Sequence, residues 1–160
     1  MGPMIRRCAP SQGANGVQTT QGAEIHWVGP GRIAPEVVAG VPSIHMVWNG
    51  AYPLCLDGRA LRLDDEVFLV LNAGHALAPR GRRDPGACLL SVYFSPELLA
   101  RAFDDLSASQ REQLRASAQG GALCLLEHMR ERDKSIAPSC ATLRTTCALA
   151  WRTRPGMRNR

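Results

Sequence analysis

The sequence has no apolar run long enough to cross a bilayer, and Arg6 and Arg7 near its start are not followed by an apolar segment. A membrane helix needs about 20 consecutive apolar residues, and a signal peptide needs an apolar core after its basic start. We therefore expect neither a membrane span nor a signal peptide. We expect a cytoplasmic protein.

Paired cysteines are also missing. The six cysteines are scattered, with no C-x-x-C pair and no histidine at zinc-finger spacing. This pattern indicates neither a disulfide framework nor a zinc finger. In a reducing compartment we expect most of the cysteines to be free thiols that pack as small hydrophobic residues.

Catalytic motifs are absent as well. There is no G-x-S-x-G elbow, and none of the four histidines (His26, His45, His75 and His128) lies two residues from another. Barrel metal sites commonly use H-x-H, because alternate residues of a strand face the same side. A site built from His26, His45 and His75 needs three separate strands to converge. We predict no catalytic residues, no metal ligands, no cofactor and no enzymatic activity.

The charge of the chain is concentrated at its end. Residues 1–133 contain 13 arginines and 14 acidic residues, whereas residues 134–160 contain six basic residues and no acid. A basic tail can contact nucleic-acid phosphates, but this one carries no groove-reading motif, and we interpret it as a solvated, irregular end. The loop segment Gly81-Arg82-Arg83 could meet an anion, although an exposed hairpin tip is the simpler interpretation.

The apolar pattern predicts strands first and helices second. Residues 1–23 resemble a loose leader. Short alternating or apolar runs punctuated by Pro and Gly then predict strands at 24–28, 36–40, 43–50, 54–58, 61–65, 67–72 and 88–94. Asp57-Gly58 between two of these runs is a hairpin signal, and Asp64-Asp65-Glu66 is a turn rather than an acid–base pair. We predict an antiparallel barrel or sandwich over 24–94.

A helical period begins at residue 95. Ser95 is a typical N-cap, with Pro96 at the first helical position and Glu97 in the first turn. Gly120-Gly121 separates this helix from a second amphipathic helix at 122–134, which would contain His128. From 135 the pattern fails, although 139–151 could form a short helix. The fold class is therefore α+β, mainly β.

The segment from Tyr52 to Phe103 resembles a known family. The runs L-D-G-R at 56–59, L-D-D at 63–65 and L-V-L-N-A-G at 69–74, followed by 92–94 and Pro96, occur in an order that is similar to the amino-terminal regulatory domain of AraC-type (AraC/XylS family) bacterial transcription regulators. The resemblance covers about residues 36–134. It implies a cupin-like β-barrel (24–94), followed by helices that mediate dimerisation (95–134).

The same resemblance implies a function. The chain would be a ligand-sensing domain that binds a small organic effector and forms a homodimer, with DNA bound only through a helix-turn-helix domain that we do not find in this sequence. Inward strand residues would line the effector pocket, and the candidates are His45, Trp48, His75 and Tyr93. His75 would be a loop residue near the barrel mouth, not a metal ligand. The alternatives are a small cupin metalloenzyme, such as an isomerase or dioxygenase, and a purely structural barrel that makes contacts through helix 96–106.

Overall fold

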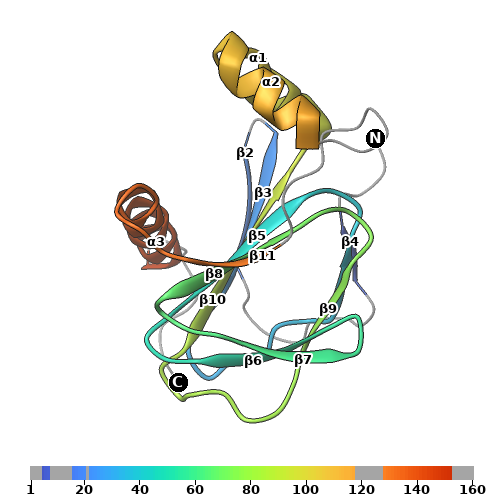
Figure 1. Cartoon of the computed structure of the whole chain (residues 1–160). Coiled ribbons are helices and arrows are strands. Elements are labelled where there is room, and N and C mark those ends of the chain that lie inside the picture. The colour runs from blue at the N-terminus through green and yellow to red at the C-terminus, as the bar shows by residue number, and fades with distance from the viewer. Residues whose placement is uncertain (1–4, 8–15, 21, 118–127, 153–160) are drawn as a thin grey trace.

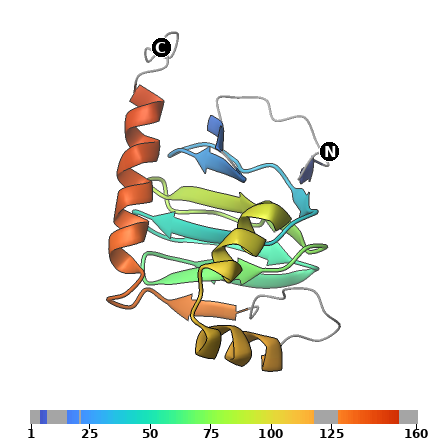
Figure 2. The same cartoon turned by 90° about the horizontal axis from the view of Figure 1, so that it is seen from above.

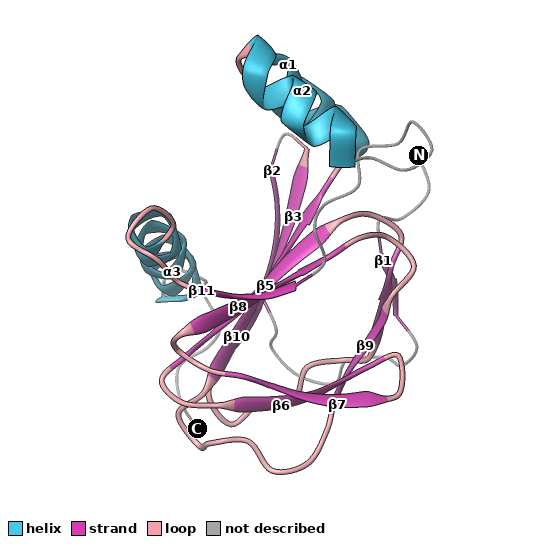
Figure 3. Cartoon of the chain, viewed as in Figure 1, coloured by secondary structure: helices cyan, strands magenta, loops and turns pink. Residues whose placement is uncertain are grey.

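The protein forms two antiparallel β-sheets that face each other, with helices at one end and on one face (Figures 1 and 3). The computed structural model describes residues 5–7, 16–20, 22–117 and 128–152. Their strands are β1 (Ile5–Arg7), β2 (Gly16–Thr20), β3 (Ala23–Val28), β4 (Val37–Ala39), β5 (Ser43–Trp48), β6 (Tyr52–Leu56), β7 (Arg59–Leu63), β8 (Val67–Leu71), β9 (Ala76–Pro79), β10 (Cys88–Phe94) and β11 (His128–Glu131).

The strands divide into a five-stranded and a six-stranded sheet. The first has the order β1-β4-β9-β6-β7 and the second the order β11-β8-β5-β10-β3-β2. Every pairing between described strands is antiparallel. The mainly-β architecture predicted from the sequence is confirmed, and the described strands form two sheets rather than one closed barrel.

Strand alternation separates the apolar residues into two clusters. In β5, Val47 faces the space between the sheets, while Met46 and Trp48 belong to a second cluster on the other face of the six-stranded sheet. Helix α3 (Ala137–Arg152) lies across that outer face (Figure 2), where Cys140 is 3% exposed. The six-stranded sheet is therefore covered on both sides.

Two turns require unusual backbone conformations. Asp57 and Gly58 have φ values of 48° and 84°, which suits the two-residue turn between β6 and β7 that the sequence predicts. Gly50 has φ 124°, and a Cβ atom there would lie 2.8 Å from the Asp84 side chain. Glycine is required at position 50 on both grounds.

The helical region after β10 consists of two short helices that project from the end of the sheets (Figure 1). Helix α1 (Pro96–Asp104) begins as predicted, with Ser95 Oγ accepting the N–H of Leu98 at 3.1 Å. Helix α2 (Ala108–Ser117) has its own cap, because Ser107 and Gln110 exchange hydrogen bonds between side chain and backbone. This second cap explains why the predicted single helix is interrupted.

Three segments differ from the sequence-based expectations. Residues 5–7 and 16–20, expected in a loose leader, form edge strands β1 and β2, because sheet edges offer unpaired backbone groups to any adjacent segment. Residues 128–131, expected in a helix, form strand β11 on the free edge of β8. Residues 132–134 of that predicted helix form loop and turn, and residues 122–127 lie outside the described residues.

The tail is also more regular than expected. Residues 137–152 form helix α3 instead of an irregular end. The Asp133 carboxylate accepts the N–H groups of Ser135 and Ile136, which orients the chain into the helix. Ile136 and Leu143 then pack with Cys140 on the outer cluster. Among the described helices, none has the length and apolarity that a bilayer crossing requires.

Candidate functional site

Six polar residues lie together on the interior face of three adjacent strands, β3, β10 and β5. Ser91 of β10 is the register partner of both His26 and His45, so these three form one row across the sheet. Tyr93, two residues further along β10, is flanked in the same way by Glu24 and Ser43 in the next row. We call these two rows the interior polar cluster: Glu24, His26, Ser43, His45, Ser91 and Tyr93.

His45 is almost completely buried within the cluster. Its side chain is held between two serines, with Nε2 3.0 Å from Ser43 Oγ and Nδ1 2.8 Å from Ser91 Oγ. His45 is 1% exposed, and burial, reinforced by the charge of His26, lowers its pKa from 6.5 to about 3. The ring is therefore neutral at physiological pH, and it donates to one serine and accepts from the other.

His26 and Glu24 form a hydrogen-bonded pair at the edge of the cluster. His26 Nε2 lies 2.5 Å from Glu24 Oε1, and the two side chains are 9% and 20% exposed. The Tyr93 ring stands between the two histidines, with centroid distances of 5.1 Å to His26 and 5.7 Å to His45, both edge-on. The cluster thus combines a hydrogen-bonded Glu–His pair, a neutral imidazole and hydroxyl groups within an otherwise apolar interior.

The four residues predicted to line a pocket do not all converge. His45 and Tyr93 belong to the interior polar cluster, as described above. Trp48 lies on the opposite face, where the Arg132 guanidinium stacks over its ring at 4.8 Å. The prediction for Trp48 was wrong for a simple reason: residues 45 and 48 have opposite parity on one strand, so both cannot point inward.

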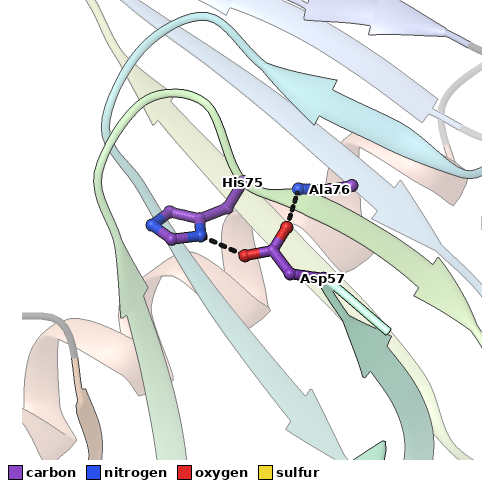
Figure 4. A network of polar contacts seen from close by, with 3 residues as sticks. All are labelled: Asp57, His75 and Ala76. Atoms are coloured by element: carbon purple, nitrogen blue, oxygen red, sulfur yellow. Dashed lines mark hydrogen bonds and ion pairs between the residues drawn. The ribbon is translucent and has the colours of Figure 1, made fainter. Parts of the chain in front are cut away.

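His75 lies elsewhere, in the turn that follows β8. Its Nδ1 is 2.5 Å from Asp57 Oδ2, and Asp57 Oδ1 accepts the N–H of Ala76 at 2.8 Å (Figure 4). These bonds hold the pKa of Asp57 below its usual value, with the His75 contact as the largest cause. His75 thus ties the β8–β9 turn to the β6–β7 turn, and it does not face the interior polar cluster.

The structure brings together two of the three histidines that the sequence analysis considered as metal ligands. Of the three histidines that a metal site would need, His26 and His45 come together on either side of Ser91, while His75 pairs with Asp57. Within the part of the chain that the structure describes, no group of three or more His, Cys, Asp and Glu side chains is arranged to hold a metal ion. His128, expected in a helix, lies in strand β11.

The sequence analysis did not predict that four further residues lie together with His45 and Tyr93: Glu24, His26, Ser43 and Ser91. The signal was present in three short runs, E-I-H at 24–26, S-I-H at 43–45 and S-V-Y at 91–93, each with polar residues two apart. These runs alone could not predict the cluster, because they do not show that β3, β10 and β5 are adjacent in the sheet. Such a cluster can bind a small molecule through a few placed hydrogen bonds in apolar surroundings.

One open hollow of about 540 Å³ lies away from this cluster. It is lined by residues of β8, β11 and the start of α3: Phe68, Arg130, Glu131, Asp133, Ser135 and Ile136. Two of these lining residues, Phe68 and Ile136, belong to the cluster on the outer face of the six-stranded sheet, so the hollow is separate from the interior polar cluster.

Comparison with known proteins does not assign a family. No protein-family model and no curated protein matches the sequence. Among solved structures, the chain is similar to a protein from Neisseria meningitidis, with 15% identity and a TM-score of 0.42 over 51% of this chain and 84% of that chain. It is also similar to a cupin 2 conserved barrel domain protein from Salinispora arenicola, with 16% identity and a TM-score of 0.32 over 61% of this chain and 79% of that chain.

Proposed function

We propose that this chain is the ligand-sensing and dimerisation domain of an AraC-type transcription regulator, and that a small organic effector binds at the interior polar cluster. The observation that carries the proposal is the cluster itself. Burying polar groups between apolar sheets is costly unless they are satisfied, and six of them gather at one place. Contact with DNA would then require the family's helix-turn-helix domain.

The residues behind the family resemblance occupy structural positions that suit this proposal. Asp57-Gly58 forms the β6–β7 turn, and Asn72 and Gly74 lie in the turn that follows β8, where Gly74 has φ 98°. Pro96 opens α1 directly after β10. The resemblance therefore follows turns and caps of the fold, which is where local backbone chemistry constrains a sequence.

The chemistry of the cluster favours an uncharged or weakly polar effector. Because its pKa is about 3, His45 offers one donor and one acceptor nitrogen without a charge. Ser43 and Ser91 hydroxyls can redirect their protons toward a ligand hydroxyl or carbonyl. The hydrogen-bonded Glu24–His26 pair lies beside them and adds further polar groups.

The test uses one purified sample for metal content, solution mass and thermal shift. We expect a dimer without a stoichiometric transition metal. We also expect at least one class among monosaccharides, aromatic alcohols and aliphatic diols to raise the melting temperature. The His45→Gln and Ser91→Ala variants should lose that rise, while the His75→Gln control, altered outside the interior, should keep it.

Two other outcomes would overturn the proposal. One tightly held transition metal per chain would identify the cupin metalloenzyme instead, with His26, His45 and Glu24 as the first ligands to substitute. A chain that responds to no compound class would indicate a structural barrel.

A further inference from the structure

The open hollow of about 540 Å³ lies where the chain turns from β11 into α3, at one corner of the six-stranded sheet (Figure 2). Phe68 and Ile136, both part of the outer apolar cluster, supply its apolar lining. Arg130, Asp133 and Ser135 supply exposed polar groups. Small-molecule sites usually measure about 300–1,000 Å³ and combine an apolar wall with a few polar groups, so this hollow has the size and the lining of such a site. We call it the corner hollow.

Arg130 is the cationic group of the corner hollow. It is the register partner of Phe68, so the two side chains lie on the same face of the sheet, the outer one. Glu131 is the partner of Val67, which packs on the core between the sheets, so the Glu131 side chain alternates to the opposite face. Within the described part of the chain the Arg130 guanidinium has no hydrogen-bond or ion-pair partner. Its N–H donors are therefore open to a ligand.

Asp133 is the anionic group of the corner hollow. Its Oδ1 accepts the Ser135 hydroxyl at 2.5 Å and the backbone N–H groups of Ser135 and Ile136 at 2.8 and 3.2 Å. These bonds, with the Ser135 side chain as the largest cause, hold the pKa of Asp133 below its usual value of 3.8, so the carboxylate is charged at neutral pH. All three bonds use the same oxygen. Asp133 is thus held in one orientation while its Oδ2 can accept a further charge-assisted hydrogen bond.

Arg132, between these two groups, anchors the connection from β11 to α3. Its guanidinium lies over the Trp48 ring at 4.8 Å and donates to the backbone carbonyls of Val47 and Asp64. Its own backbone N–H donates to the carbonyl of Glu66 at 2.7 Å. Because the connection is fixed at both its backbone and a side chain, a ligand meets a corner that is already ordered, which lowers the entropic cost of binding.

Charges of both signs surround the corner hollow and nearly cancel. The basic side chains at this corner are Arg130, Arg132, Lys134 and Arg144. The acidic side chains are Asp64, Asp65, Glu66, Glu131 and Asp133. Four basic against five acidic groups leave a balance of −1, which favours neither a polyanion nor a polycation. The charges instead suit a ligand that carries one charge of each sign.

We propose that the corner hollow binds a free α-amino acid with an apolar side chain. The α-carboxylate pairs with the Arg130 guanidinium, and the α-ammonium group donates to Asp133 Oδ2. The apolar side chain packs against Phe68 and Ile136. A fatty acid or a simple amine would leave one of the two charged groups without a partner, and a peptide would bring only one of its charged ends to the hollow. The proposal holds whether or not the interior polar cluster binds an effector.

The test is isothermal titration calorimetry of the full chain with L-leucine and with two analogues that each lack one charged group. We expect L-leucine to bind, and 4-methylpentanoate (no amino group) and L-leucinamide (no carboxylate) to bind about tenfold more weakly. Arg130→Gln should weaken the binding of L-leucine about tenfold but change that of L-leucinamide little. Asp133→Asn keeps an amide oxygen for the Ser135 and Ile136 bonds, so the turn is retained. It should weaken the binding of L-leucine to the same extent but change that of 4-methylpentanoate little.

Two charge-matched controls alter exposed residues elsewhere: Arg62→Gln on the edge strand β7 and Asp105→Asn after α1. Both should bind L-leucine like the wild type, as should Ser91→Ala in the interior polar cluster. The proposal is overturned if L-leucine does not bind, if either analogue binds as tightly, or if either the Arg130 or the Asp133 variant binds L-leucine unchanged. Equal loss in the controls would also overturn it, and loss in Ser91→Ala would place the amino acid in the interior polar cluster instead. An effector screen without hits leaves this experiment unaffected.

Discussion

The buried neutral His45 makes a specific prediction about stability and pH. Its folded-state pKa is about 3, whereas the ordinary value is 6.5. Between these values the unfolded chain binds a proton that the folded chain does not bind. The contribution of His45 is therefore complete above pH 6.5 and is lost as the pH falls toward 3.

The magnitude follows from the two pKa values. On lowering the pH from 7 to 5, proton uptake by the unfolded state costs the wild type about 2 kcal/mol of unfolding free energy through this residue. His45→Gln removes the titration but keeps an amide donor and acceptor that can reach Ser43 and Ser91. The variant should therefore be less stable at pH 7, by about 1 kcal/mol, yet lose much less stability on acidification.

The assay is urea denaturation at several pH values between 5 and 7, followed by tryptophan fluorescence. The quantity compared is the difference in unfolding free energy between wild type and variant as a function of pH, which cancels the other titrating groups. His75→Gln, which replaces a half-buried histidine outside the interior polar cluster, serves as the control. Parallel curves for wild type and His45→Gln would refute the reasoning, because they would mean that His45 titrates equally in both states.

Three further predictions concern contacts outside the cluster. Because His75 lowers the Asp57 pKa, this pair stabilises the fold above the ordinary Asp pKa of 3.8 and loses its effect as the pH falls below it. The variant His75→Ala should therefore raise the Asp57 pKa in a carbon-detected NMR titration. It should lower the free energy of unfolding at neutral pH by only about 0.2–1 kcal/mol, since the pair is exposed. Arg132→Met should retain part of the packing on Trp48 but lose the guanidinium hydrogen bonds to backbone carbonyls, at a cost of about 1–3 kcal/mol in urea denaturation. Gly50→Ala should lower the melting temperature by several degrees, since position 50 has φ 124° and no space for a methyl group; an unchanged melting temperature would contradict the turn geometry.

Local signals in the sequence predicted local structure well. The Asp57-Gly58 turn and the Ser95 cap of α1 are specified by the chemistry of a few adjacent residues, and both occur where expected. The mainly-β class followed from alternation over several short runs in the same way.

Features that depend on distant partners could not be predicted. Strands β1 and β11 lie at sheet edges, and their backbone partners β4 and β8 belong to segments far away in sequence. Strand β2 also lies at an edge, where its polar residues pair with the adjacent strand β3. Intrinsic preference is weak beside such tertiary pairing. The interior polar cluster has the same origin: alternation places His26, Ser91 and His45 on one side of their strands, but only the strand order makes them neighbours.

The position of β10 has a consequence for how the molecule opens. This strand is hydrogen-bonded on both sides, to β3 and β5, and six of its seven residues are buried, whereas α1 has no buried residue at all. Amide protons exchange with solvent through local opening, and the most deeply packed strands open last. The backbone amides of β10 should therefore keep their hydrogens longest in heavy water, while those of α1, which begins only two residues after β10 ends, should exchange among the first.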